Sequence, residues 1–246
     1  MRMTWTVFKR ELAGYFATPV AYVFIVIFLV LAGTFAFAEE FGALYERGQA
    51  DLASFFVFHP WLYLFLIPAL SMRLWAEERH SGTFELLMTL PIPTWSSVVG
   101  KFLAAWVFTG ITLALTCPVW ITVWYLGDPD HGAIAAGYIG SFLMAGGFLA
   151  IGACMSALTR SQVVAFILSV VACFVMLLAG HNVVQSLMAD RVPEFISETI
   201  KGFSFLTRFD SISRGVIAPN DLVFSFSLIA VLLAANTIIV NMKKAG

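Results

Sequence analysis

Residues 75–93, WAEERHSGTFELLMTLPIP, form a charged, turn-containing piece between two long apolar runs. Gly82 allows the chain to turn after the charged triplet, and Pro91 prevents a helix from continuing further. Between them, Thr83 is a candidate N-cap, and Glu85 lies in the first turn, where the helix dipole favours a carboxylate. The pattern predicts a helix of about two turns, roughly 10 Å long, outside the hydrocarbon.

The composition indicates an integral membrane protein. Of 246 residues, 60% are hydrophobic and only 12% are charged, with a mean hydropathy of +0.90. Soluble domains carry about 25% charged residues, so this chain has too few to face water on all sides. The net charge of −1 gives no sign of nucleic-acid binding. Cys117, Cys154 and Cys173 fall in apolar runs without metal-site spacing, as expected of buried hydrophobic residues.

The apolar runs predict an all-α transmembrane domain over residues 1–246. About 20 apolar residues cross the hydrocarbon, and helices satisfy their own backbone groups there. Long apolar runs also differ from the alternation of a membrane β-barrel. The sequence AFA at 36–38 resembles a signal-peptidase site, but the preceding run is longer than a usual signal, which favours an uncleaved span. The six predicted spans are 19–38, 57–75, 102–126, 134–158, 163–180 and 222–241.

The distribution of basic residues predicts the orientation. With six spans, both termini and the segment 76–101 lie on one side of the membrane. That side carries nine of the 14 basic residues, which by the positive-inside rule makes it cytoplasmic. These nine are Arg2, Lys9, Arg10, Arg73, Arg79, Lys101, Arg160, Lys243 and Lys244. Residues 181–220 then form an outer loop.

An amphipathic helix is predicted over residues 1–18, ahead of the first span. Trp5, Phe8 and Leu12 recur at helical spacing, and Lys9 and Arg10 lie largely off that stripe. Such a helix can lie in the membrane interface with its basic groups near headgroup phosphates. The alternative is an ordinary positively charged flank whose periodicity is accidental.

Two other segments carry patterns with open interpretations. The fourth predicted span has small residues four apart, which favours close packing within the bundle over packing against a second copy. The outer loop has Phe195, Ile196, Ile200 and Phe203 at helical spacing, which predicts short amphipathic helices. For the stretch around Phe209, a solvated loop is favoured over ligand contact.

The missing motifs weigh against several functions. No GxxxxGK[ST] loop occurs, so the chain does not bind ATP in that way. The spans lack Asp, Glu, Lys and Arg away from their ends, which weighs against an ion-coupled secondary carrier. An intramembrane enzyme would need His59, His131 and His181 to converge on a metal. We favour interfacial histidines, no metal and no catalytic residues.

The segment EERHSGTFELLMTLPIPTWSSVVGK resembles the signature of ABC-2-type transporter permeases. The N-terminal FKRELAGYFATP is similar to the interfacial connecting helix of that family, and RFDSISRGVIAPND resembles its gliding-motility-associated subgroup. The resemblance therefore covers essentially the whole chain. The signature positions are Glu77, Glu78, Gly82, Thr83, Leu86, Leu87, Pro91, Gly100 and Lys101.

The resemblance implies a permease that works with two copies of a cytoplasmic ABC ATPase and with a second permease chain, identical or homologous, in a bacterial inner membrane. ATP and magnesium would bind the ATPase, and this chain would hold no cofactor. Its short cytoplasmic helix would enter a groove on the ATPase, and the preceding charges would engage the rim. The implied coupling residues are Glu77, Glu78, Arg79, Gly82, Thr83, Phe84, Glu85, Leu86, Leu87, Leu90 and Pro91.

The spans offer few polar side chains to line a hydrated channel. This favours export of an amphipathic or lipid-like cargo, or mechanical work without a conventional cargo. The alternatives are an intramembrane enzyme and an ion-coupled secondary carrier.

Overall fold

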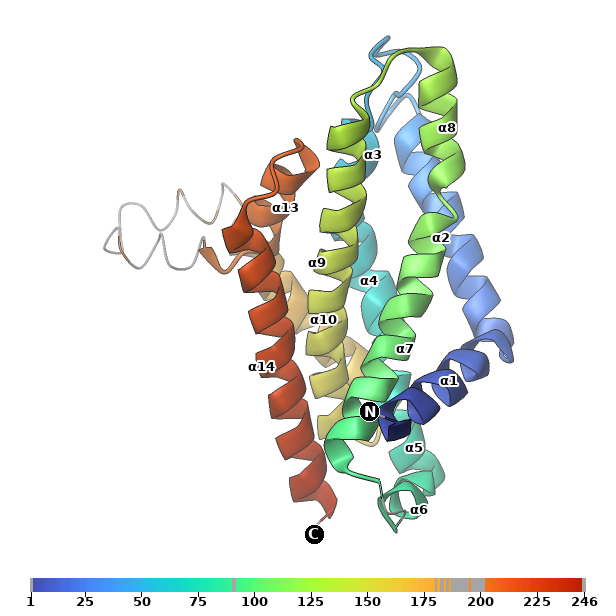
Figure 1. Cartoon of the computed structure of the whole chain (residues 1–246), viewed down its shortest axis with the longest axis vertical. Helices are drawn as coiled ribbons and strands as arrows, with labels where there is room; N and C mark the ends of the chain where they lie inside the picture. The colour runs from blue at the N-terminus through green and yellow to red at the C-terminus, as the bar shows by residue number, and fades with distance from the viewer. Residues whose placement is uncertain are drawn as a thin grey trace.

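The computed structural model describes residues 2–89, 92–179 and 202–244, together with the single residues 181, 184, 186 and 195. These residues are mainly helical and contain no β-strand, so the predicted all-α class is confirmed for the part that is described (Figure 1). The helices are α1 Arg2–Phe16, α2 Pro19–Phe37, α3 Ala53–Val57, α4 His59–Ser71, α5 Arg73–Ser81, α6 Thr83–Thr89, α7 Thr94–Ala114, α8 Cys117–Leu126, α9 His131–Leu158, α10 Gln162–Leu178, α13 Phe205–Ser213 and α14 Pro219–Lys244.

The length and hydropathy of the helices fit an integral membrane protein. Within the described residues, four helical stretches are long and apolar enough to cross a bilayer: α2, α7 with α8, α9 and α14. The apolar helix α10 is shorter, at 17 residues, and α4 has 13. The classification as an integral membrane protein therefore rests on several long apolar helices and not on one segment alone.

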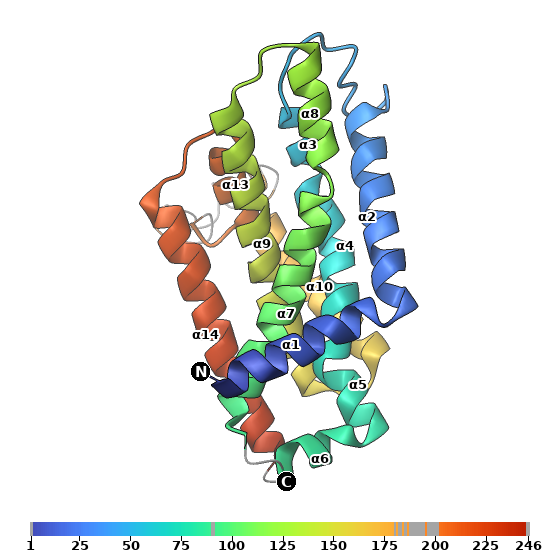
Figure 2. The same ribbon diagram turned by 45° about the vertical axis from the view of Figure 1, so that its right-hand side comes forward.

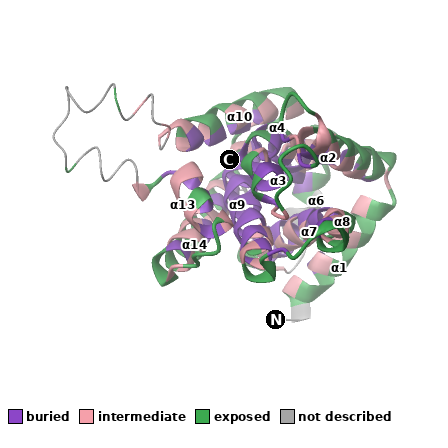
Figure 3. Cartoon of the chain, turned by 90° about the horizontal axis from the view of Figure 1, so that it is seen from above, coloured by how far each residue is buried: buried purple, intermediate pink, exposed green. Residues whose placement is uncertain are grey.

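Helix α9 forms the centre of the bundle. Seen from above, its buried surface is surrounded by the other helices (Figure 3), and it contacts α4, α5, α7, α10, α13 and α14. Its glycines allow this crowding, because a Cβ atom on Gly146 would lie 2.8 Å from the Trp106 ring, and one on Gly147 would lie 2.5 Å from Phe205. The predicted packing of this span within the bundle is confirmed.

The helices near two predicted span boundaries have limits of their own, while the ends of the spans in the membrane stay predictions. Helix α4 ends at Ser71 and is followed after Met72 by α5, which continues to Ser81, and Trp75 is buried. The third run becomes helical at Thr94, well before residue 102, because extended Pro93 places the start of the helix directly after it. Lys101 consequently lies about two turns inside α7.

Both described ends of the chain lie at the same end of the bundle as α5 and α6 (Figure 2). Helix α1 crosses α7 obliquely there, while α3 and α8 lie toward the opposite end. The charged segment around α6 therefore lies at the same end of the bundle as both termini.

The predicted outer loop, residues 181–220, contains a helix where a solvated loop was favoured. Phe205, Phe209 and Ile212 of α13 are buried against α9, because the bare backbone at Gly140 admits the side chains of Ile212 and Phe209. The interpretation of Phe209 as part of a solvated loop is therefore wrong. Ile196 and Ile200, which were predicted to lie on a short helix, are outside the described residues.

Candidate functional site

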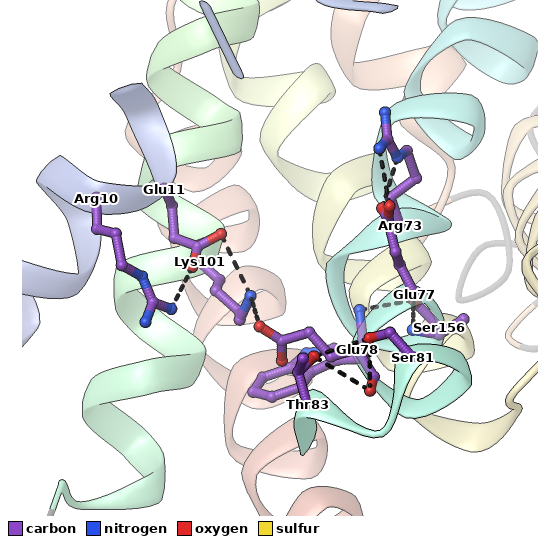
Figure 4. A network of polar contacts seen from close by, with 11 residues as sticks. Arg10, Glu11, Arg73, Glu77, Glu78, Ser81, Thr83, Lys101 and Ser156 are labelled. Carbon is purple, nitrogen blue, oxygen red and sulfur yellow. Dashed lines mark hydrogen bonds and ion pairs between the residues drawn. The ribbon is translucent and has the colours of Figure 1, made fainter. Parts of the chain in front are cut away.

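Lys101 is the centre of an ionic cluster that joins three helices (Figure 4). Its Nζ atom lies 2.7 Å from Oε1 of Glu78 on α5 and 3.3 Å from Oε2 of Glu11 on α1. Lys101 is only 3% exposed, and its ammonium group lies 5.4 Å from the centre of the Trp75 ring. A buried cation requires compensating charge, and here that charge comes from two separate elements. We call Lys101, Glu78 and Glu11 the ionic cluster.

Helix α1 reaches the cluster because α7 carries a glycine at the crossing point. A Cβ atom on Gly100 would lie 2.8 Å from Cγ1 of Val7, so α1 packs against bare backbone. Glu11 follows Val7 by one turn and faces Lys101. Arg10 also binds Glu11, at 2.6 Å. Burial raises the pKa of Glu11, but Lys101 and Arg10 outweigh it and hold the pKa below its ordinary value.

The predicted apolar stripe of α1 does not coincide with its buried face. Trp5 is 57% exposed and stacks on Phe8, with the Lys9 ammonium 5.2 Å from its ring centre. Phe8 and Leu12 are half-buried, and Lys9 and Arg10 are exposed. Helix α1 therefore packs on α7 through one face and presents Trp5 and Lys9 outward, as an interfacial helix requires.

Helix α5 is attached to α9 by a serine hydroxyl. Oγ of Ser156 accepts hydrogen bonds from the backbone N–H groups of Trp75 and Ala76, both at 3.1 Å, and donates to the Met72 carbonyl at 2.8 Å. The Arg79 guanidinium donates to the Ala157 carbonyl at 3.0 Å. The α4–α5 junction is thereby fastened to the end of α9.

The charged residues predicted to meet a partner have contacts inside the chain. Glu77 binds Arg73 through two hydrogen bonds, of 2.6 and 2.9 Å, and this contact holds the pKa of Glu77 below its ordinary value. Glu78 binds Lys101, and Arg79 contacts α9. Any contact of these three residues with another protein stays a prediction.

Helix α6 follows a left-handed residue and folds back beneath α5. Gly82 has φ +76°, a conformation that favours glycine. The Thr83 hydroxyl contacts Ser81 Oγ at 2.9 Å and the Glu78 carbonyl at 3.4 Å. Phe84 is only 8% exposed and packs edge-on against Trp75. The fold-back therefore covers the Phe84 ring within the chain, and any contact of Phe84 with another protein stays a prediction.

The structure describes some of the remaining predicted coupling residues and not others. Glu85 is exposed in the first turn of α6, while Leu86 and Leu87 are positions on that helix. Leu90 and Pro91 lie outside the described residues.

The histidines do not assemble a metal site in the described part of the chain. No group of three or more His, Cys, Asp or Glu residues is placed there to hold an ion. His131 is exposed at the start of α9, where its Nδ1 accepts from Trp120. His59 is fully buried, and its ring lies against Phe28 at the midpoint of the apolar helix α2, which does not fit an interfacial histidine.

Sequence reasoning missed Glu11 and Ser156 as members of the site. A signal for Glu11 was present, since Lys101 directly precedes a predicted span, where a buried lysine requires a nearby carboxylate. The helical spacing of α1 showed only that Glu11 lies off the apolar stripe, and this did not identify its partner. Ser156 gave no comparable signal, because serine is common among small residues in membrane helices.

Comparison with known proteins gives a match over nearly the whole chain. The family described as ABC-2 family transporter protein matches residues 5–241. A protein named heme exporter protein B from Paracoccus denitrificans is 35% identical over 77 residues, 31% of this chain and 35% of that protein. Its namesake from Rhodobacter capsulatus is 36% identical over 72 residues, 29% of this chain and 33% of that protein. The chain thus spans about a third of the length of these relatives.

Proposed function

The chain belongs to the ABC-2 family of transporter proteins, and from that premise we propose that it is the permease subunit of an ATP-driven exporter. The chain is a membrane subunit of an ABC transport system and has no phosphate-binding loop of its own. Two copies of a separate cytoplasmic ATPase bind ATP and magnesium. A second permease chain, identical or homologous, completes the transporter.

The ionic cluster is the observation that carries this proposal. Displacement of α6 by an ATPase acts on α5 through the short turn at Gly82. Because Glu78 binds buried Lys101, a shift of α5 moves α7, and because Glu11 binds the same ammonium, it also moves α1. Separating these charges in a poorly hydrated site is costly. The three helices therefore move as one body.

Glu85 and the α6 positions Leu86 and Leu87 form the proposed contact with the ATPase. Glu85 is exposed on α6, and α6 lies at the end of the bundle that carries both termini (Figure 1). Phe84 and Glu78 serve instead to hold α6 and α5 to the rest of the chain. Force applied to α6 is thus passed inward through packed and charged contacts.

The arrangement in the membrane is proposed to comprise six spans. Helices α2, α7 with α8, α9 and α14 are joined by the shorter α10 and by the α3–α5 segment. The excess of basic residues places the termini and α6 in the cytoplasm of a bacterium, with the chain in the inner membrane.

The proposed cargo is an amphipathic or lipid-like molecule, because the described spans present mainly apolar side chains. Mechanical work without a conventional cargo is the second form of the proposal. The names of the two relatives make heme one cargo to test.

The test is purification of the tagged chain from its native cell in mild detergent, with mass spectrometry of the proteins recovered. We expect a near-stoichiometric soluble protein that carries a phosphate-binding loop. Leu87→Asp on α6 should abolish its recovery. The matched control is Tyr125→Asp at a 90% exposed position of α8, which should retain it. Recovery of the wild-type chain alone, after crosslinking in lipid discs as well, would overturn the proposal, as would full recovery with Leu87→Asp.

A further inference from the structure

A buried polar cluster lies between α4 and α9, away from the ionic cluster. Nδ1 of His59 is 3.1 Å from Oγ of Ser141, which is 2.7 Å from the Tyr63 hydroxyl. Both His59 and Ser141 are completely buried. The Tyr63 ring stacks on Phe28, at the midpoint of α2. The cluster therefore lies at about half the depth of that span.

One atom of the cluster has no partner. Nε2 of His59 makes no hydrogen bond with any described residue, although it is buried. Phe28, Phe55 and Phe56 surround the imidazole, with ring centres 4.5–6.0 Å away. Leaving such a group unsatisfied costs about 1–3 kcal/mol, so its retention calls for an explanation. An ionisable side chain at this depth of a membrane protein indicates a functional site.

Counting the donors and acceptors of the cluster indicates that the unpartnered Nε2 atom of His59 carries a proton and is a hydrogen-bond donor. If Tyr63 donates to Ser141 and Ser141 donates to Nδ1 of His59, both hydroxyl hydrogens are used. The imidazole proton then lies on Nε2. If the proton were on Nδ1 instead, one of the two hydroxyl hydrogens of Tyr63 and Ser141 would have no acceptor among these three residues. His59 is therefore set to donate one hydrogen bond.

A cavity of about 290 Å³ reaches the same aromatic group from the end of the bundle opposite α6. Phe56 lines this cavity and also packs edge-on against His59, with ring centres 5.4 Å apart. The Phe56 ring rests on bare backbone of α9, since a Cβ atom on Gly137 would lie 2.4 Å from it. Phe56 thus borders both the cavity and the polar cluster.

We propose that the cavity and the His59–Ser141–Tyr63 cluster form one binding site for an uncharged amphiphile that carries a carbonyl-type acceptor. The ligand displaces the Phe56 ring, places its apolar body among the phenylalanines and accepts a hydrogen bond from Nε2 of His59. The acceptor is uncharged, because the cavity lining includes Asp51, Asp130 and Asp210 but only Arg214 as a cation. This site does not depend on the proposed coupling to an ATPase.

Benzophenone is a suitable probe, because it is an apolar aromatic ketone that attaches to nearby C–H bonds on illumination. The full chain in lipid discs is labelled, and the attached peptides are identified by mass spectrometry. We expect labelling of α3 and the first turns of α4. Fluorenone, which has the carbonyl, should compete about five- to tenfold better than fluorene, which lacks it, as expected for one hydrogen bond.

Variants of the cluster distinguish a hydrogen bond between His59 and the ligand from simple partitioning of the ligand into lipid. His59→Leu should remove the preference for fluorenone, while His59→Gln, which retains an N–H donor, should keep part of it. Ser141→Ala should give an intermediate preference and serves as the second variant if His59→Leu does not fold. The proposal is overturned if fluorene competes equally in the wild type, if labelling avoids α3 and α4, or if the folded variants keep the full preference.

Discussion

Lys101 on α7 and Glu78 on α5 form an ion pair of 2.7 Å at the end of the bundle where α5 and α6 lie, and Glu11 of α1 binds the same ammonium. The pair joins a residue two turns inside an apolar helix to one in a charged segment. It therefore fixes the position of α5 relative to the membrane-spanning part of the chain.

Removal of both carboxylates should cost far more stability than removal of either one. In Glu11→Gln with Glu78→Gln, Lys101 is left buried without a charged partner, which costs about 3–5 kcal/mol. Each single variant leaves one carboxylate in place and should cost less. Unfolding in detergent by heat and by denaturant measures the difference.

The matched control is Lys101→Met combined with Glu11→Gln and Glu78→Gln, because it removes the buried cation together with both of its carboxylates. It should be more stable than the double glutamine variant while still losing coupling to the ATPase. If either single glutamine variant were as unstable as the double variant, the shared role of Glu11 and Glu78 would be contradicted.

Acid should weaken the attachment of α1. The folded-state pKa of Glu11 lies below its ordinary value of 4.5. Its contribution to stability is therefore complete above the ordinary pKa and is lost as the pH falls through the folded pKa. We expect the unfolding temperature to fall in this acidic range, and to fall less in Glu11→Gln. Glu77, whose pKa is also lowered, is present in both proteins, so their difference reports Glu11.

The sequence predicted the all-helical membrane class because apolar length is a local property. It did not predict that helix α5 would continue through the charged residues Glu77 and Arg79 as far as Ser81. In the structure, Ser156 supplies hydrogen bonds to the backbone at Trp75, and the charged side chains find partners nearby. Such compensation depends on α9, which is remote in sequence.

The parts of the site that depend on local sequence were predicted, and the parts that depend on contacts between remote elements were not. The turn at Gly82 and the short helix after it follow from local residue preferences. Burial of Phe84 depends on Trp75 and the fold-back, and the role of Glu11 depends on how α1 crosses α7. Helical periodicity cannot identify which face of α1 meets another helix when both faces carry apolar residues.

Gly100→Leu should detach α1 from α7. Even a Cβ atom would lie 2.8 Å from Val7 and 3.1 Å from the Thr4 carbonyl, so a larger side chain forces the helices apart at a cost of about 1–3 kcal/mol. Spin-label distances between Thr6→Cys on α1 and Ile111→Cys on α7 should lengthen. Gly33→Ala is the control, because nothing lies within 4 Å of a Cβ atom there. An unchanged distance in Gly100→Leu would refute the crossing.

Ser156→Ala should destabilise the junction of α4 and α5. The substitution removes the acceptor of the Trp75 and Ala76 N–H groups and the donor to Met72, which leaves buried backbone groups unsatisfied at a cost of about 1–3 kcal/mol. Ser169→Ala is the matched control: Ser169 is equally buried, but its hydroxyl only donates within its own helix, to Ala165. Its loss should cost about 1 kcal/mol or less. Hydrogen exchange of the α5 amides locates the effect, which should be faster in Ser156→Ala and unchanged in Ser169→Ala. Equal exchange in both variants would show that Ser156 does not hold α5 to α9.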